Sequence, residues 1–471
     1  MRRQAGVAAG NADTVRTAVE VLRAGGTAVD AVVAAGFAAA VSEPTLTGLG
    51  GGGFLLVDRP GNEPVVLDFF VSSPGQGAEV EPHMVPVTLH FEDADQEFHV
   101  GWGSVAVPGC LDGYIAAHAR WGRLPLSDVV APARRLGLEG SVLDGIQAGL
   151  LVLLREVLTL SAEGRELYGP GGNLLQQGEI QRNEAYAALL SSVAAGEVRS
   201  LASDALVEAA AAGGGVLTRA DLASYAVVER APLRFTHAAG EVLTNPPPSV
   251  GGSRVLAALQ RVSGGGTAAD WAQSLTSALV HASGVPAPAP QVRRGTTHIS
   301  VVDAEGTAAA MTTSLGSCSG VFVPGTGVQL NNMMGELDLH PDGLHALAPG
   351  TRIGSMTAPT VVRAPDGTVT ALGTGGSERI RSTMTCVLSR LLDRGSELEQ
   401  AVRAPRVHWD GERLQVEPGL PEEPLRAYAV NRWSRPDLYF GGVHAVRRSP
   451  DGTVTAVGDD RRGGVAAVID L

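Results

Sequence analysis

The chain has 471 residues, of which 44% are hydrophobic, and its formal net charge at pH 7 is −13. This length and composition allow a large buried core, in several domains or in one large layered α/β unit. The negative charge argues against nucleic acid and against an anionic membrane surface as partners. All 36 positively charged residues are arginine, which excludes enzymes that need a Schiff-base lysine, a P-loop lysine or a Ser–Lys dyad.

The three cysteines, Cys110, Cys318 and Cys386, are far apart and form no CxxC pair. This argues against a disulfide framework or a zinc site, and no histidines have the spacing of metal ligands. We therefore expect no metal and no cofactor. The N-terminus lacks the apolar stretch of a signal peptide, and the most apolar segment, residues 31–41, is too short to span a bilayer. These features favour a reduced, cytoplasmic setting.

The first part of the chain has mainly helical patterns. A polar residue within 11–13 begins a helix that ends at the glycines 25–26. Residues 27–30 form a capping-box-like start to a second helix, which is nearly all apolar and must be covered on all sides. Helical patterns return over 101–160 and 183–195. These segments predict a substantial helical layer.

A glycine run, residues 48–53, matches the letters of a GxGxxG motif. A dinucleotide site needs the order strand, glycines, helix, whereas here a helix comes before the run and the strand 54–57 follows it. We expect instead that the glycines allow a close backbone approach, in the core or to a substrate.

Strand patterns dominate later in the chain. Residues 216–245 predict short strands, and the stretch 284–295, rich in proline and glycine, predicts an exposed linker. Two alternating segments, 297–303 and 307–314, predict paired strands joined by a tight turn. Helices early in the chain and strands later favour helices packed on stacked sheets.

Thr296 stands where the linker ends and a strand begins. A threonine in a strand is usually no more than a good β-former. Cleavage after Gly295, however, would give Thr296 a free α-amine with a pKa near ~7.7 beside its own hydroxyl. That pairs a nucleophile with a general base, as in N-terminal threonine enzymes. Gly295 has no Cβ and tolerates the strain that attack on its own carbonyl would require.

A second candidate is the glycine-rich turn between a predicted strand, 368–372, and a predicted helix, 377–393. This element order suits an anion at a helix N-terminus, but the Walker pattern is absent. The N–H groups of Gly375 and Gly376 would suit an oxyanion hole, and a plain turn is the alternative.

Two further patterns carry weaker signals. The polar residues Asn331, Asn332, Glu336 and Asp338 follow an apolar strand, and they form either a turn or a site for a substrate's ammonium group. Residues 316–320 resemble a nucleophile elbow with a cysteine at the centre, but no helix pattern follows them.

Together these segments resemble the γ-glutamyltranspeptidase family. The matching segments are spread over nearly the whole chain: 25–31, 48–54, 105–109, 122–125, 217–222, 246–249, 296–298, 330–332, 355–356 and 375–376. The resemblance implies an α+β fold, a four-layer αββα sandwich cut into a large subunit, 1–295, and a small subunit, 296–471. It implies that Thr296 is the nucleophile and that Gly375 and Gly376 form the oxyanion hole. Ser314 occupies the place of a family threonine that hydrogen-bonds the nucleophile's amine.

The expected substrate pocket departs from the family pattern. Phe70 stands where the family has an arginine for the substrate's α-carboxylate, Gly316 where it has an asparagine, and Gly354 where it has the first of two serines. A bidentate arginine–carboxylate contact is strong, so its loss points to a different acyl group. Glu336 replaces the aspartate that binds the α-amine, and we expect that contact to survive. The stretch before Thr296 is also shorter than usual. The expected substrate-binding residues are Phe70, Asn332, Glu336, Ser355 and Met356.

Three functions compete. The first is an autoprocessed hydrolase that forms an acyl-enzyme with a small, amino-acid-like substrate other than an ordinary γ-glutamyl compound. The family includes cephalosporin-type acylases and enzymes of antibiotic biosynthesis that cleave C–C bonds, and Phe70 and Gly316 favour this branch. The second is an ordinary γ-glutamyltransferase or glutathione hydrolase that binds its carboxylate differently. The third is a non-catalytic binding protein with the same fold. In the first two cases the expected protein partner is the other subunit of the same precursor.

Overall fold

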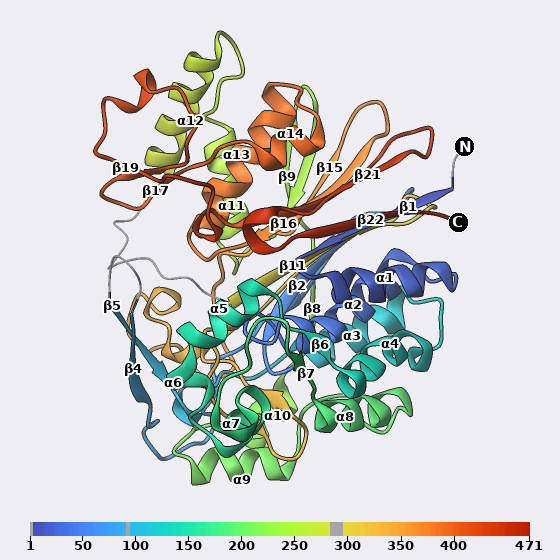
Figure 1. The fold of residues 1–471 in the computed structure, drawn as a ribbon, viewed down its shortest axis with the longest axis vertical. Helices are drawn as coiled ribbons and strands as arrows, with labels where there is room; N and C mark the ends of the chain where they lie inside the picture. Colours follow the sequence, from blue (N-terminus) through green and yellow to red (C-terminus); the bar gives the residue numbers. More distant parts are fainter. Residues whose placement is uncertain (1–2, 91–94, 283–294) are drawn as a thin grey trace.

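Two antiparallel β-sheets are stacked face to face at the centre of the molecule, with helices on the outer face of each (Figure 1). The computed structural model describes residues 3–90, 95–282 and 295–471. The first sheet has the strand order β22 (Val465–Asp470), β1 (Gln4–Ala9), β11 (Gly295–Val302), β12 (Ala308–Gly316), β2 (Gly52–Asp58), β3 (Val65–Phe69) and β8 (Val228–Arg230). The second has the order β21 (Val454–Val457), β20 (Gly442–Arg448), β16 (Val369–Gly375), β15 (Thr360–Arg363), β10 (Gly240–Thr244) and β9 (Leu233–His237).

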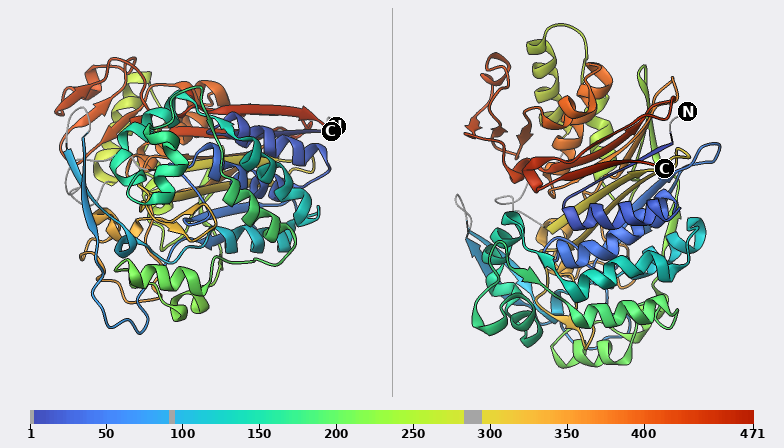
Figure 2. Two further views of the ribbon diagram at one scale, coloured as in Figure 1. Left: turned by 60° about the horizontal axis from the view of Figure 1, so that its bottom comes forward. Right: turned by 45° about the vertical axis from the view of Figure 1, so that its right-hand side comes forward.

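Helices complete the predicted four layers, as the two turned views also show (Figure 2). Three helices pack directly on the first sheet: α1 (Ala12–Arg23), α2 (Ala28–Ser42) and α3 (Cys110–Trp121). Two others form an outer tier around α2: α4 (Leu126–Glu139) and α8 (Glu184–Ala194). The second sheet is covered by α11 (Gly251–Leu259), α13 (Arg379–Asp393) and α14 (Leu398–Arg403), with α12 (Ala268–Ala282) packed on α11 and α13.

Smaller elements surround this sandwich. The helices are α5 (Gly145–Leu153), α6 (Arg155–Leu158), α7 (Ala162–Tyr168), α9 (Asp204–Ala212) and α10 (Arg219–Ser224). The short sheets are β4 (Val85–His90) with β5 (Asp95–Val100), β6 (Ser141–Val142) with β7 (Ile180–Gln181), β13 (Phe322–Val323) with β14 (Val328–Gln329), and β17 (Val407–Trp409) with β18 (Leu414–Val416) and β19 (Val430–Arg432). No helix within the described ranges combines enough length with enough apolar character to span a bilayer.

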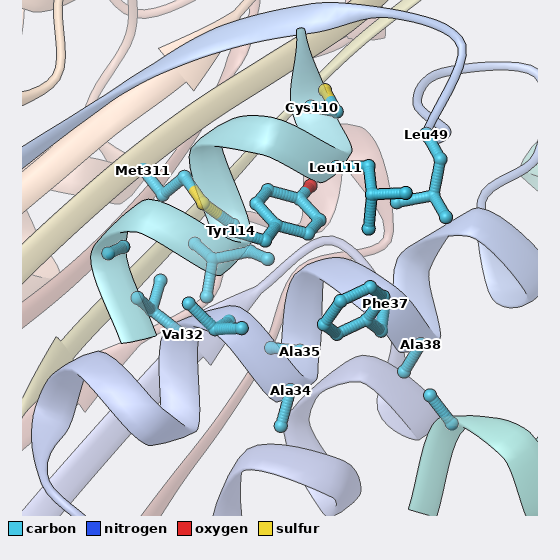
Figure 3. Close-up of a cluster of buried hydrophobic side chains, with 14 of the residues drawn as sticks. Val32, Ala34, Ala35, Phe37, Ala38, Leu49, Cys110, Leu111, Tyr114 and Met311 are labelled. Atoms are coloured by element: carbon cyan, nitrogen blue, oxygen red, sulfur yellow. The ribbon is translucent and has the colours of Figure 1, made fainter. Parts of the chain in front are cut away.

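The nearly all-apolar helix α2 is covered on all sides, as its sequence requires. All of its residues except Ala40 are buried. Figure 3 shows α3 lying across it, with the Tyr114 ring directed at Phe37. The two ring centroids are 5.2 Å apart in an edge-to-face arrangement. A Cβ on Gly36 would lie 2.7 Å from the Tyr114 ring, so the close contact of these helices requires glycine there.

The glycine run, residues 48–53, allows a close approach of backbones in the core, which is one of the two roles predicted for it. A Cβ on Gly50 would lie 2.1 Å from the carbonyl oxygen of Gln329, and one on Gly51 would lie 2.1 Å from that of Ser314. Side chains there would displace the backbones beside β2. The run therefore brings the end of β12 close to its neighbours.

Several local predictions are confirmed. Asn11 caps α1, and Thr27 with Asp30 forms a capping box at the start of α2. The predicted strands around residues 303–306 are β11 and β12, joined by a tight turn. The prediction of strands throughout 216–245 is wrong in part, because Thr218 and Asp221 form a capping box that starts the helix α10. The predicted linker lies outside the described residues except for Gly295.

The expected subunit boundary falls inside β11, between Gly295 and Thr296. Each of the two segments supplies strands to both sheets: β1, β2, β3 and β8 to β10 precede the boundary, and the others follow it. A cut at this position would therefore leave two chains that share one core.

Candidate active site

The start of β11 brings together the first two predicted residues. Thr296 is opposite Ser314 in the register of β11 and β12, beside an irregularity in the pairing between Gly295 and Thr296. Thr296 Oγ1 donates a hydrogen bond to Ser314 Oγ at 3.2 Å, and Ser314 Oγ donates to the carbonyl oxygen of Gly295 at 2.5 Å. The serine hydroxyl thus joins the threonine hydroxyl to the carbonyl group of the preceding peptide bond.

Gly295 is tightly enclosed. A Cβ at this position would lie 2.4 Å from the carbonyl oxygen of Thr45 and 2.6 Å from that of Gly316. Any side chain would force these backbones apart. Close packing is therefore a reason for glycine at residue 295, in addition to the tolerance of strain that its sequence context predicts.

The glycine-rich turn between β16 and α13 lies against the nucleophile candidate. A Cβ on Gly375 would lie only 2.2 Å from the carbonyl oxygen of Thr296. Gly376 has φ +132° and Ser377 has φ +52°, both values that L side chains rarely adopt. The chain then enters α13, whose N-terminal end favours negative charge. The predicted oxyanion turn and Thr296 therefore meet, although they belong to different sheets.

A hollow with about 390 Å³ of space between atoms opens at Thr296. Six residues of its lining come from the predicted set: Phe70, Thr296, Ser314, Glu336, Ser355 and Met356. The other lining residues are Gly316, Met333, Leu339, Thr357, Ser377 and Ile380. Gly295, Asn332, Gly375 and Gly376, which were also predicted, are not among the lining residues. Glu336 is the only charged residue that lines the hollow, among the residues that the structure describes.

Phe70 forms a fixed apolar wall. Its ring stacks on Phe54 with centroids 5.3 Å apart and an interplanar angle of 17°. Its carbonyl oxygen accepts hydrogen bonds from the Tyr225 hydroxyl, at 2.9 Å, and from the guanidinium of Arg352. Arg352 also pairs with Asp68 at 3.4 Å. This arginine therefore supports the backbone of Phe70 and is not part of the lining.

Gly316 leaves room for two other polar side chains. A Cβ there would lie 2.4 Å from Asn332 Oδ1 and 2.6 Å from Glu336 Oε1, and its φ is +69°. Asn332 Oδ1 accepts a hydrogen bond from the Ser317 N–H at 2.7 Å, and the Ser317 hydroxyl donates to Glu336 at 3.4 Å. Asn332 Nδ2 has no hydrogen-bond partner among the described residues. The pair of Asn332 and Glu336 thus occupies the space that a side chain on residue 316 would need.

Asn331 and Asp338 have other roles. Asn331 bonds the backbones of Gly50 and Ala106, so it supports the core rather than the hollow. Asp338 accepts a hydrogen bond from the Ser377 hydroxyl at 3.5 Å. Neither residue lines the hollow, so neither is placed to bind a substrate's ammonium group there.

Ser355 and Met356 form another wall of the hollow. The Ser355 hydroxyl is 3.0 Å from that of Thr357, and the Ser355 carbonyl accepts from Ser249 at 2.9 Å. Met356 Sδ is 3.4 Å from Nη1 of Arg254, which pairs with Glu378 at 3.0 Å. An ion pair therefore lies at the edge of this wall.

Two charged residues near Thr296 have no sequence motif that would reveal them. Glu43 is buried and accepts hydrogen bonds from Thr297, at 2.6 Å, and Thr14, at 2.8 Å. Burial raises the pKa of the Glu43 carboxyl from 4.5 to about 7. Arg462, also buried, donates to the carbonyl oxygen of Thr296 at 3.3 Å.

The rival cysteine elbow lacks the features of a nucleophile. Cys318 has φ +68° and is fully buried, and β13 rather than a helix follows it. Burial raises the pKa of its thiol, which opposes thiolate formation. Among the described residues, no three histidine, cysteine or acidic side chains are grouped so as to hold a metal ion.

The profile of the gamma-glutamyltranspeptidase family matches residues 14–279 and 266–469. The chain belongs to the γ-glutamyltranspeptidase family. It is therefore an enzyme of this group of N-terminal-nucleophile hydrolases, as the sequence predicts. The Acylase ACY 1 proenzyme of Pseudomonas sp. (strain SE83) is 30% identical over 506 aligned residues, which cover 96% of this chain and 91% of the relative. The glutathione hydrolase proenzyme of Escherichia coli (strain K12) is 27% identical, with 98% and 90% covered.

Solved structures confirm the γ-glutamyltranspeptidase fold. The cephalosporin acylase from Bacillus halodurans matches with a TM-score of 0.83 and 23% identity, covering 99% of this chain and 96% of that one. The structure of LmbA2991HD matches with a TM-score of 0.80 and 23% identity, covering 99% and 98%. At this identity the likeness establishes the αββα architecture.

Proposed function

We propose that this member of the γ-glutamyltranspeptidase family cleaves itself between Gly295 and Thr296 and then hydrolyses a substrate other than an ordinary γ-glutamyl compound. The contact that carries the proposal is the Ser314 hydroxyl, which bonds both Thr296 Oγ1 and the Gly295 carbonyl oxygen. It holds the attacking hydroxyl beside the peptide bond before Thr296 and polarises the carbonyl that is to be attacked. Self-cleavage would give the subunits 1–295 and 296–471.

The mature enzyme would work through an acyl-enzyme. Thr296 Oγ1 adds to the substrate carbonyl carbon, and its proton passes to the new α-amine, directly or through water. The N–H groups of Gly375 and Gly376 stabilise the oxyanion, the leaving group takes the proton, and water then hydrolyses the ester. With a ketone substrate, the tetrahedral adduct would collapse by breaking the bond to the adjacent carbon; that carbon leaves with the electron pair and takes the proton from the α-amine, and water hydrolyses the remaining ester. This C–C cleavage is the reaction we propose for a role in antibiotic biosynthesis.

The lining supports a changed substrate. Phe70 occupies the position of the family's carboxylate-binding arginine, and Gly316 that of its asparagine. The nearby Arg352 binds Asp68 and the Phe70 backbone. Glu336 supplies a negative charge, and Phe70, Met333, Leu339, Met356 and Ile380 supply apolar surface. This chemistry favours an acyl group with an ammonium or N–H group for Glu336 and no carboxylate.

Three chromogenic anilides separate the possibilities. The γ-glutamyl 4-nitroanilide carries both an amine and a carboxylate, the 4-aminobutanoyl compound keeps only the amine, and the glutaryl compound keeps only the carboxylate. We expect the 4-aminobutanoyl compound to be the best of the three and glutaryl the poorest, and Glu336→Gln to remove that preference. Robust γ-glutamyl turnover would favour an ordinary glutathione hydrolase, which the retained acidic residue Glu336 also supports.

Intact mass measures the self-cleavage. The purified chain should yield a small subunit that begins at Thr296, whereas Thr296→Ala should remain whole. A wild-type chain that stays whole after incubation would contradict the proposal and leave a non-catalytic binding protein as the explanation.

A further inference from the structure

Arg462 is a buried cation placed behind the nucleophile and outside the substrate pocket. It ends a short 3-10 turn, Asp460–Arg462, just before β22, and only 8% of its surface is exposed. Nη1 donates to the carbonyl oxygen of Thr296 at 3.3 Å, and Nε donates to that of Leu438 at 3.4 Å. Arg462 does not line the hollow at Thr296, so it acts on the site from behind.

The same guanidinium lies against the predicted oxyanion turn. A Cβ on Gly375 would lie 2.9 Å from Arg462 Nη1, and one on Gly376 would lie 3.6 Å from Nη2. A Cβ on Gly442, opposite Gly375 in the strand pairing, would lie 2.6 Å from Arg462 Cβ. Gly375 and Gly442 therefore make room for this one side chain, which bonds Thr296 and lies in ordinary van der Waals range of Gly376.

We propose that Arg462 is a positioning residue for Thr296, which fixes its carbonyl group and supplies a buried positive charge that favours the neutral α-amine and the oxyanion. This inference rests on the proposed function, in which Thr296 is the nucleophile. A nearby positive charge disfavours protonation of an amine and stabilises a developing negative charge, and both effects are strong where water is excluded. The two effects therefore assist the same reaction step.

Other charged groups around Arg462 modify its effect. Glu43, at the end of α2, interacts electrostatically with Arg462 and with Asp144. His444 on β20 interacts with Arg462, and burial lowers the pKa of His444 to about 4, so it stays neutral near pH 7.

The other titratable groups near this pair are His298, Asp459 and Glu336. His298 on β11 faces His444, and burial lowers the pKa of His298 as well. Asp459 interacts with His444 but is bound by Arg406 and Arg461. Glu336 lies on the pocket side. Arg462 and Glu43 are thus the pair whose charges most directly set the electrostatics behind Thr296.

The test measures how the α-amine of Thr296 titrates. The mature protein is treated with cyanate from pH 5 to 9, and carbamoylation of the small subunit is followed by intact mass. Hydrolysis of 4-nitrophenyl acetate is measured over the same range, with Thr296→Ala as background. Arg462→Met should raise the apparent pKa of the amine by about one pH unit and lower kcat/KM at pH 7 about tenfold. Arg462→Lys keeps the positive charge and should return the apparent pKa of the amine most of the way to the wild-type value.

Two further variants separate this effect from a loss of structure. Arg390→Met is the matched control, because Arg390 is also a buried arginine, bonded to Cys386 and Pro405 on the far side of the second sheet. Arg390→Met should lower the stability of the protein without changing the apparent pKa of the Thr296 amine. Glu43→Gln removes the opposing charge and should lower the apparent pKa of the amine, even if Arg462→Met does not fold.

Each outcome decides the inference. An unchanged titration in folded Arg462→Met, or an equal change in Arg390→Met, would overturn it. If Arg462→Met does not fold, a titration of Glu43→Gln that is unchanged or moves upward would do the same. A wild-type chain without a Thr296 N-terminus would instead refute the proposed function itself, so the two failures are distinguishable.

Discussion

The hydroxyl oxygens of Thr296 and Ser314 are 3.2 Å apart, on paired residues of neighbouring strands. The Ser314 hydroxyl directs its own proton to the carbonyl oxygen of Gly295, and its oxygen also accepts from the Gly316 N–H at 3.0 Å. The serine orientation is therefore fixed from two sides. This arrangement suits attack by Thr296 on the preceding carbonyl group, because the polarising donor is in place before the reaction.

Replacement of Ser314 by alanine should slow self-cleavage about 100-fold, since a single donor to a developing oxyanion contributes on that order. Ser314→Thr should retain most of the rate. Thr313→Val is the matched control, because the Thr313 hydroxyl pairs with Thr47 at 2.8 Å instead. The time course of the small subunit on a denaturing gel gives the three rates. Equal rates for Ser314→Ala and Thr313→Val would contradict this role of Ser314.

The sequence predicts the parts of this site that depend on local pattern. The capping box at the start of α2, the alternation in β11 and β12 and the glycine-rich turn each depend on residues close together in the sequence. Pairing of the two strands then follows from their tight turn, so the local pattern is enough to predict that Thr296 and Ser314 meet.

The remaining parts depend on packing between distant segments. Glu43 bonds Thr297 across 254 positions, and Arg462 bonds Thr296 across 166. Both are single charged residues without a motif, and a buried carboxylate or arginine is recognisable only when its partners are known. The apolar lining residues Leu339 and Ile380 could not be predicted from the sequence either, because an apolar residue predicts burial but not a place in a pocket.

Gly316→Asn introduces the asparagine that the sequence resemblance leads us to expect at this position, but it should not create γ-glutamyl activity. Its Cβ would collide with Asn332 and Glu336. We expect a destabilisation of about 1–3 kcal/mol, the range for overpacked sites, and reduced turnover of every anilide. Gly325→Asn is the control: Gly325 has φ +72°, close to the +69° of Gly316, and a Cβ added to it would meet no atom within 4 Å. Thermal unfolding compares them. A stable, γ-glutamyl-active Gly316→Asn variant would show that the pocket can rearrange.

The stability of the fold should depend on pH through Glu43. Its pKa is about 7 in the folded chain against an ordinary 4.5, because burial penalises the charged form. The raised pKa contributes about 3 kcal/mol to the free energy of unfolding. This contribution is fully present below pH 4.5 and is lost as the pH rises to about 7. Relative to Glu43→Gln, the wild type should therefore lose stability over this range in urea unfolding.

The control for this pH effect has the opposite sign. Hydrogen bonding to Arg123 lowers the pKa of Glu305, so its contribution is present at neutral pH and is lost only in acid. Glu305→Gln should therefore track the wild type from pH 5 to 8. A constant difference between wild type and Glu43→Gln over that range would show that Glu43 titrates normally.

Phe70 should determine substrate fit, whereas its stacking partner Phe54 should affect stability alone. Both rings are buried, and either substitution by leucine removes the same stacked pair, at a cost of about 1–3 kcal/mol. Only Phe70 lines the hollow beside Thr296. Phe70→Leu should therefore change KM several-fold for the best anilide, whereas Phe54→Leu should leave KM within about twofold. The two variants should lower Tm by similar amounts. Steady-state kinetics and thermal unfolding of the two variants measure both effects. If the two variants change KM equally, the effect travels through the stacked pair and Phe70 does not contact the acyl group.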